Sequence, residues 1–218
     1  MRLQSAIFDM DGTLLDSMTM WMDLGANMLR SQGIEPEADL QSKLNVLGLR
    51  QGAEYCKRVY HMSQSVDEVV ALIEERVDHF YRSEVQAKPG VQKFLSLLKM
   101  EGVWMYVATA TDRHLAEAAL KHAGIDGYFR GIITCTEAGK GKDDPEIYER
   151  AMRRLQSNKR DTVIFEDALH AIQTAKGAGF RVCGVYDAAA EADRPEIEAL
   201  SDYYIHSFEE MFETQTMD

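Results

Sequence analysis

The sequence predicts an α/β fold in which a doubly wound parallel sheet carries an inserted, all-helical segment. Short apolar runs alternate with helical stretches through most of the chain, which is the order expected of a parallel sheet covered on both faces. Residues 17–88 interrupt this order, because they contain several helical patterns and no convincing strand. The chain has 218 residues, which at about 150 residues per domain favours one domain with an insertion.

Six short apolar runs are the expected strands of this sheet. The first run is followed by Gly12, so it is interpreted as a strand that ends in a turn. Comparable runs recur five times later in the chain. The six expected strands are residues 3–8, 103–108, 132–135, 162–165, 181–185 and 203–205.

Capping residues mark the expected helix ends. Asp144 is expected as an N-cap with Pro145 at the first helical position, and Gly179 closes a later helix. Inside the insertion, Ser65 and Glu68 have the spacing of a capping box and predict the start of a helix.

We expect a hinge at each end of the insertion, because turn-forming residues flank it. Asp16-Ser17 stands on one side, and the run Ala-Lys-Pro-Gly at residues 87–90 stands on the other. We expect residues 1–16 and 89–218 to form the core and residues 17–88 to form the helical insertion.

Composition and charge exclude several classes of partner. The net charge is −12 and no Lys/Arg run exceeds a pair, so nucleic acid is not an expected partner. The longest strongly apolar run, residues 103–108, is far shorter than the roughly 20 residues that cross a bilayer. Acidic residues near the N-terminus argue against a signal peptide, and three dispersed cysteines argue against a disulfide framework or a zinc site. We expect a cytoplasmic protein with no membrane partner.

Two acidic pairs follow expected strands. Asp9 and Asp11 lie two residues apart after the first strand, so in extended backbone both side chains project to one side. Glu166 and Asp167 follow the fourth strand and can share the same crevice at the carboxyl ends, although they could instead be charges at a helix N-terminus. Four carboxylates would repel one another unless a cation intervened, and an all-oxygen ligand set favours magnesium over zinc.

A hydroxyl and a lysine complete the candidate site. Thr109 ends a third strand and could hydrogen-bond a phosphoryl oxygen, although Thr109-Ala110-Thr111 could also be an ordinary helix cap. Lys142 precedes a helix, and its ammonium could neutralise both a carboxylate and a phosphoryl group. Lys140 is the competing lysine, and a solvated loop lysine is the alternative to both.

These segments, in this order, resemble the motifs of the haloacid dehalogenase superfamily of phosphotransferases. Residues 9–17, Asp-Met-Asp-Gly-Thr-Leu-Leu-Asp-Ser, match the first motif almost residue for residue. Thr109 falls at the second motif, Lys142 at the third and Glu166-Asp167 at the fourth. The similarity spans the whole chain, and the helical insertion resembles the mobile cap of that family.

The resemblance implies a chemical role for each residue of the site. Asp9 would be the nucleophile that becomes an aspartyl phosphate, and Asp11 would act as general acid and then as general base. Thr109, Ala110 and Lys142 would bind the phosphoryl group.

The resemblance also implies a magnesium site. The Asp9 carboxylate, the Asp11 main-chain carbonyl and Asp167 would be its ligands, with Glu166 supporting the ion directly or through water. The metal, the lysine and amide donors would together cancel the repulsion between an anionic nucleophile and an anionic phosphate.

We therefore expect a hydrolase, a magnesium-dependent phosphatase that acts on a small phosphorylated metabolite through an aspartyl phosphate on Asp9. Asp11 argues against the dehalogenase branch, which has no acid two residues after the nucleophile. A sugar-phosphate mutase of the β-phosphoglucomutase type is an alternative, but Trp21 stands where its cap-hinge histidine would fall. A phosphate-sensing or partner-binding protein without turnover is the other alternative.

Substrate choice is expected to depend on the insertion. Arg50, in an expected loop at residues 47–52, could present its charge to an anionic end of the substrate, or it could be plain solvated surface. The first helix of the insertion begins Ser-Met-Thr-Met-Trp-Met at Ser17, and this apolar face could roof the site or pack into a core.

Overall fold

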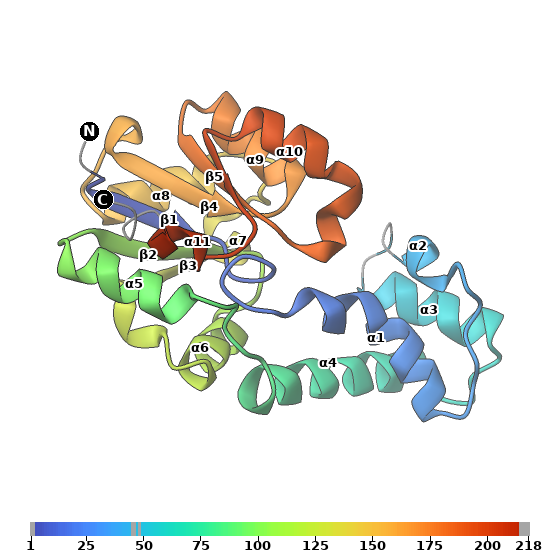
Figure 1. Cartoon of the computed structure of the whole chain (residues 1–218). Coiled ribbons are helices and arrows are strands. Elements are labelled where there is room, and N and C mark those ends of the chain that lie inside the picture. Colours follow the sequence, from blue (N-terminus) through green and yellow to red (C-terminus); the bar gives the residue numbers. More distant parts are fainter. Residues whose placement is uncertain (1–2, 45–46, 48, 214–218) are drawn as a thin grey trace. The chain divides into compact units, whose positions relative to one another are not determined.

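The computed structural model describes residues 3–44, 47 and 49–213 (Figure 1). The chain divides into two compact units. The core unit takes the chain up to Met18 and again from Glu84 onward, and the helical unit is Thr19–Ser83. The boundaries expected after residues 16 and 88 stay a prediction.

The core unit contains a six-stranded parallel sheet. Its strands are β1 (Ser5–Phe8), β2 (Trp104–Thr109), β3 (Ile132–Thr134), β4 (Thr162–Glu166), β5 (Arg181–Val185) and β6 (Tyr203–Ile205). Their spatial order is β3-β2-β1-β4-β5-β6. The predicted fold class is therefore confirmed, and each strand falls within one residue or two of its expected range.

The two central strands are buried on both faces. Every residue of β1 and of β4 is buried, which is why these segments read as apolar runs in the sequence. Ile7 and Ile164 belong to a core cluster that includes side chains from three helices of the second half of the chain. Phe8 and Phe165 stack at 4.5 Å between ring centroids, and both contact Phe94.

Helices connect the strands of the core unit (Figure 1). They are α5 (Val91–Met100), α6 (Arg113–His122), α7 (Cys135–Ala138), α8 (Glu146–Arg154), α9 (Leu169–Gly177), α10 (Arg194–Leu200) and α11 (Glu210–Glu213), with 3₁₀ turns η1 (Asp126–Tyr128), η2 (Lys159–Asp161) and η3 (Ala188–Asp193). The N-cap of α8 is Pro145 and not the expected Asp144, because the helix begins at Glu146. The Asp144 Oδ1 still accepts a hydrogen bond from the Glu146 N–H at 2.9 Å. Gly179, at φ +85°, follows the end of α9.

The strand order fixes where a ligand site is expected. From β1 the chain continues to β2 and β3 on one side of β1. It then crosses to the other side of β1, where β4, β5 and β6 follow in order. The reversal of direction lies between the neighbouring strands β1 and β4. Open parallel sheets bind ligands beyond the carboxyl ends of the strands at such a point.

The helical unit contains α2 (Leu40–Leu44), α3 (Leu49–Val59), α4 (Val66–Ser83) and all of α1 (Met18–Ser31) except its first residue. The Ser65–Glu68 capping box that precedes α4 is confirmed: the Ser65 N–H donates to Glu68 Oε2 at 2.7 Å, and the Glu68 N–H donates to Ser65 Oγ at 3.2 Å. Among the described residues, no helix has the length and apolar character to span a membrane.

The prediction of a loop at residues 47–52 is wrong, because α3 already begins at Leu49. Gly52 suggested a loop, but Ala53 and Cys56 form a buried face of the helix. Gly48 lies outside the described residues.

Candidate active site

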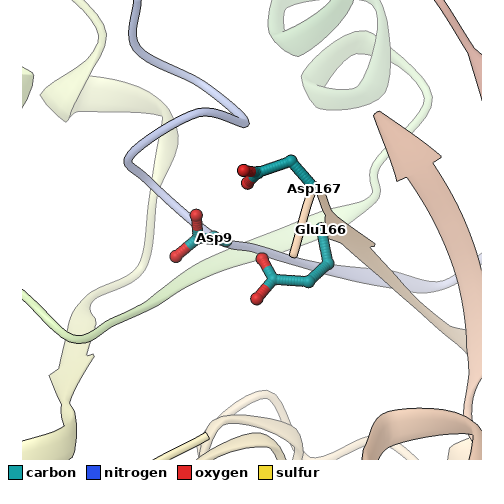
Figure 2. A group of neighbouring side chains, drawn as sticks. All are labelled: Asp9, Glu166 and Asp167. Atoms are coloured by element: carbon teal, nitrogen blue, oxygen red, sulfur yellow. The ribbon is translucent and has the colours of Figure 1, made fainter. Parts of the chain in front are cut away.

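Three carboxylates gather at the carboxyl ends of β1 and β4. Asp9 follows β1, Glu166 ends β4 and Asp167 comes next in the chain. One oxygen of each lies within 4.8 Å of the others (Figure 2). The Asp9 N–H donates to the carbonyl of Phe165 at 2.9 Å, so strand pairing itself places the first acid beside the other two. All three acids are buried, with exposed fractions of 5%, 0% and 5%.

Lys142 lies among these acids. Its Nζ donates to Asp9 Oδ1, and to Glu166 Oε1 at 2.8 Å. Burial disfavours the Lys142 charge, but the carboxylates of Asp9 and Glu166 outweigh it and raise the lysine pKa well above its ordinary value. Lys140, the competing residue, has a side chain that is 60% exposed and lies 3.7 Å from Asp144. The structure thus brings Lys142, and not Lys140, into the acid cluster.

The acids carry more negative charge than the lysine neutralises. Burial and the charge of Asp9 raise the pKa of Glu166 well above its ordinary value, and the same two causes raise the pKa of Asp167 to about 8. Oε2 of Glu166 is buried and has no hydrogen-bond partner within the described ranges. A buried polar atom without a partner is costly.

These observations fit a divalent cation. Positive charge at the cluster would relieve the repulsion that raises the two pKa values, and it would compensate the unpartnered oxygen of Glu166. The donors are carboxylate oxygens, which hard cations prefer.

The loop after β1 closes over Asp167. Thr13 Oγ1 donates to Asp167 Oδ1 at 2.7 Å. Gly12 has φ +85°, and a Cβ at this position would collide with the Asp167 carboxylate. Glycine and threonine in the Asp-Met-Asp-Gly-Thr segment therefore position an acid that lies more than 150 residues further along the chain.

Asp11 is held separately from the three clustered carboxylates. Its Oδ1 accepts a hydrogen bond from Ser17 Oγ at 2.7 Å, and its Oδ2 accepts one from Thr111 Oγ1 at 2.6 Å. The two hydroxyls come from the loops that follow β1 and β2. They fix the Asp11 carboxylate between these loops, while three carboxylates rather than four form the compact group.

Thr109 is buried at the end of β2, and Ala110 is exposed in the loop that follows. Thr109 Oγ1 accepts a hydrogen bond from the Thr111 N–H at 3.0 Å, so the hydroxyl shapes this loop. Since β2 pairs with β1 in parallel register, this loop also leaves the sheet at its carboxyl edge. The sequence did not indicate that the Thr111 hydroxyl donates to Asp11, because Thr111 was interpreted there only as part of a possible helix cap.

Tyr148 is a second residue near the acids that the sequence did not indicate. It lies on α8, is fully buried, and its hydroxyl is 3.4 Å from Glu166 Oε1. Burial and the charge of Glu166 raise the tyrosine pKa well above its ordinary value. A single aromatic residue at helical spacing is typical of a core helix, so only the fold connects it with the acids.

Arg50 and Trp21 belong to the helical unit. Arg50 is 2.8 Å from Asp67 Oδ1, and its side chain is 63% exposed. Trp21 Nε1 donates to the Tyr81 hydroxyl at 3.0 Å. The role of Arg50 toward a substrate stays a prediction.

Comparison with known proteins shows which protein family the chain matches. The model of the family described as haloacid dehalogenase-like hydrolase matches residues 6–185, which include all four motif segments. The chain is 26% identical over 184 residues to the phosphorylated carbohydrates phosphatase of Thermotoga maritima, a match that covers 84% of the chain and 85% of that protein.

Two further matches extend over nearly the full chain. Identity to hexitol phosphatase A of Escherichia coli strain K12 is 27% over 219 aligned positions, with 99% of the chain and 96% of that protein covered. A crystal structure described as a putative β-phosphoglucomutase from Thermotoga maritima superposes with a TM-score of 0.82 at 25% identity, with 97% and 98% of the two chains covered.

Proposed function

Because this chain belongs to the haloacid dehalogenase-like hydrolase family, we propose that it is a magnesium-dependent phosphatase of small phosphorylated metabolites, with Asp9 as nucleophile. The observation that carries the proposal is the contact of the buried Lys142 ammonium with Asp9 inside a group of three buried carboxylates. A carboxylate placed in this way can attack phosphorus while the adjacent cation compensates the charge that accumulates.

The reaction we propose has two displacements at phosphorus. Asp9 attacks the phosphoryl group, the bond between phosphorus and the ester oxygen breaks, and Asp11 gives its proton to the leaving oxygen. Asp11 then takes a proton from water, which attacks the aspartyl phosphate and releases inorganic phosphate and the free Asp9 carboxylate. The hydroxyls of Ser17 and Thr111 hold Asp11 in place for both proton transfers.

Binding of the phosphoryl group depends on Lys142 and the loop after β2. The Lys142 ammonium already contacts Asp9, so a phosphoryl group that approaches this carboxylate comes within reach of the same donor. Thr109 and the loop with Ala110 stand at the same edge of the sheet and would add hydrogen-bond donors to the phosphoryl oxygens.

The metal we propose is Mg²⁺. Asp9, Asp167 and the main-chain carbonyl of Asp11 would hold it, with Glu166 beside it, since these are hard oxygen donors. When bound, the ion would neutralise charge on the phosphoryl oxygens.

Two relatives support a sugar or polyol phosphate as the substrate. They are named as phosphatases of phosphorylated carbohydrates and of hexitols. We propose that the helical unit acts as the cap that selects the leaving group, with Arg50 as one contact of an anionic substrate. The predicted cap boundaries, residues 17–88, belong to this proposal.

A β-phosphoglucomutase activity is the second candidate, because a structure described as a putative enzyme of that kind matches nearly the whole chain. Against it stands Trp21, whose indole cannot shuttle a proton and donates to Tyr81 within the helical unit. Hydrolysis is therefore preferred.

A substrate panel tests the proposed function. Purified protein is incubated with sugar, polyol and nucleotide phosphates and with p-nitrophenyl phosphate, with Mg²⁺ or with a chelator. We expect Mg²⁺-dependent release of inorganic phosphate that Asp9→Asn abolishes. Conversion of a hexose 1-phosphate to its isomer without phosphate release would support the mutase, and an equal rate for Asp9→Asn would contradict both.

A further inference from the structure

Glu166 has an incomplete set of partners. It is the acid of the cluster with no exposed surface, and its Oε1 accepts a hydrogen bond from Lys142 at 2.8 Å. Its Oε2 has no partner in the described part of the chain. In the metal-free protein, the donors that reach Oε1 therefore orient this carboxylate, and they continue to hold Oε1 when a cation compensates Oε2.

Tyr148 supplies a second donor to the same oxygen. Its hydroxyl lies 3.4 Å from Glu166 Oε1, and the residue belongs to the helix α8. The ring is fully buried in the core and meets Phe180 edge-on, with 6.4 Å between ring centroids. A phenylalanine would pack equally well at this position, whereas a buried hydroxyl is costly unless it is hydrogen-bonded. The hydroxyl is thus explained by Glu166 rather than by packing.

The contact of the Tyr148 hydroxyl is long, and the same oxygen also accepts a hydrogen bond from Lys142. Hydrogen bonds from a hydroxyl to a carboxylate are usually about 2.5–2.7 Å, and the distance here exceeds that range. Lys142 occupies the near position on Oε1 while it also contacts Asp9. One ammonium therefore serves two carboxylates before any substrate binds.

A substrate changes this division. In the reaction proposed above, Lys142 also donates to a phosphoryl oxygen at Asp9. Its ammonium, which has three N–H donors, then serves three anionic acceptors, so its hydrogen bond to Glu166 weakens. We propose that Tyr148 is a positioning residue: its hydroxyl closes onto Glu166 Oε1 when Lys142 engages the phosphoryl group, and it keeps the Glu166 carboxylate oriented during turnover. This inference rests on the proposed phosphatase function.

The variant Tyr148→Phe removes the hydroxyl and keeps the ring. Because the hydrogen bond strengthens only after the phosphoryl group binds, its loss should lower kcat and leave KM nearly unchanged. With p-nitrophenyl phosphate and Mg²⁺, we expect kcat to fall by about ten- to 100-fold, which is the effect of one hydrogen bond to a charged group. KM should change by less than about twofold.

Tyr128→Phe is the matched control. The Tyr128 hydroxyl is 2.7 Å from Ser96 Oγ, away from the acids, so its removal also costs one hydrogen bond. This variant should keep the wild-type kcat. Melting curves from circular dichroism give the folded fraction of each variant, and kcat is normalised to it. A normalised kcat for Tyr148→Phe that equals the wild-type value would show a structural role only and would overturn the proposal.

Glu166→Leu provides the test that Tyr148 acts through Glu166, because leucine has no oxygen that could accept a hydrogen bond from the Tyr148 hydroxyl. Addition of Tyr148→Phe to Glu166→Leu should cause no further loss of kcat, because the carboxylate that the hydroxyl orients is gone. An equal fold-loss in both backgrounds would overturn the proposal. A wild-type protein without Mg²⁺-dependent phosphate release would instead remove the proposed function, and the inference with it.

Discussion

Lys142 shows most clearly how a single residue joins the fold to the chemistry. Its ammonium pairs with Asp9 and Glu166, and its side chain is only 8% exposed. If it is lost, two carboxylates remain buried without their cation, which is much more costly than the loss of an exposed ion pair.

We expect Lys142→Met to lower phosphatase activity by at least about 100-fold, because both phosphoryl binding and charge compensation are lost. It should also reduce the free energy of unfolding of the metal-free protein by about 3 kcal/mol. Lys140→Met is the control, since Lys140 is exposed, and it should leave both quantities near wild type. Phosphate release measures the activity, and urea unfolding measures the free energy of unfolding. Equal effects of the two substitutions would contradict the assignment of Lys142, rather than Lys140, to the site.

Asp167 gives a pH dependence with a definite sign. Its pKa is raised to about 8 in the metal-free protein, so the folded state retains a proton that the unfolded state loses near pH 4. This proton stabilises the metal-free fold at low pH, and the contribution is lost as the pH rises through about 8. A cation that uses this carboxylate must displace the proton.

The apparent affinity for Mg²⁺ should therefore rise with pH by about tenfold per unit until about pH 8 and then level off. The rise in melting temperature at a fixed Mg²⁺ concentration measures it. Asp167→Asn should weaken Mg²⁺ binding and make its pH dependence less steep, because one of the two protonated acids at the site, Asp167 and Glu166, is removed. A stabilisation by Mg²⁺ that is stronger at about pH 6 than at about pH 8 would contradict the interpretation.

At the scale of residues, the sequence identified the acids but not their partners. Asp9 and Asp167 follow strands and Glu166 ends one, so the alternation of strands and helices allowed a shared crevice, and the resemblance to the family implied a shared magnesium site. The spacing favoured Lys142 and left Lys140 open, because two residues of one loop differ mainly in which of them the fold buries. Tyr148 was not predictable either, since its role depends on the distance to an acid on another element.

At the scale of elements, the return linker between the helical unit and α5 is fastened to the core. The Lys88 N–H donates to the Leu14 carbonyl at 2.9 Å, and Lys88 Nζ donates to the Tyr186 carbonyl at 2.7 Å. Nζ is also 2.8 Å from Asp187 Oδ2, and the two side chains are only 13% and 7% exposed. One lysine thus ties the linker to the loop after β1 and to the end of β5.

Lys88→Met should reduce the free energy of unfolding by about 3 kcal/mol, because it leaves the Asp187 carboxylate buried without its cation. Lys121→Met, an exposed position at the end of α6, serves as control and should change it by less than about 0.5 kcal/mol. Urea unfolding measures both variants. A Lys88 variant as stable as the control would show that this ion pair does not hold the linker.

The strands were the most predictable elements. A parallel strand that is buried on both faces needs an unbroken apolar run, so β1, β4 and β5 are visible in the sequence. The start of α3 was not predictable, because the glycine at position 52 suggests a loop. The apolar helix face with Ala53 and Cys56 is recognised only from its burial in the structure.

At the scale of the whole molecule, the chain combines a widely shared sheet with a separate helical unit. The fold class follows from the alternation of strands and helices and is confirmed. The family follows from four short motifs and is confirmed by a match over most of the chain. The substrate does not follow in the same way, because the side chains that would select it are ordinary exposed or packed residues of the helical unit, such as Arg50.

The central claim is that Asp9 accepts the phosphoryl group, and an acid quench followed by mass spectrometry of the intact and digested protein tests it most directly. Asp11→Asn is mixed with p-nitrophenyl phosphate and Mg²⁺, because this leaving group needs no proton and loss of the base should slow attack by water. We predict one added phosphoryl group on the peptide that contains Asp9, and none in Asp9→Asn. Turnover with no labelled protein, or a label on another residue, would contradict the account.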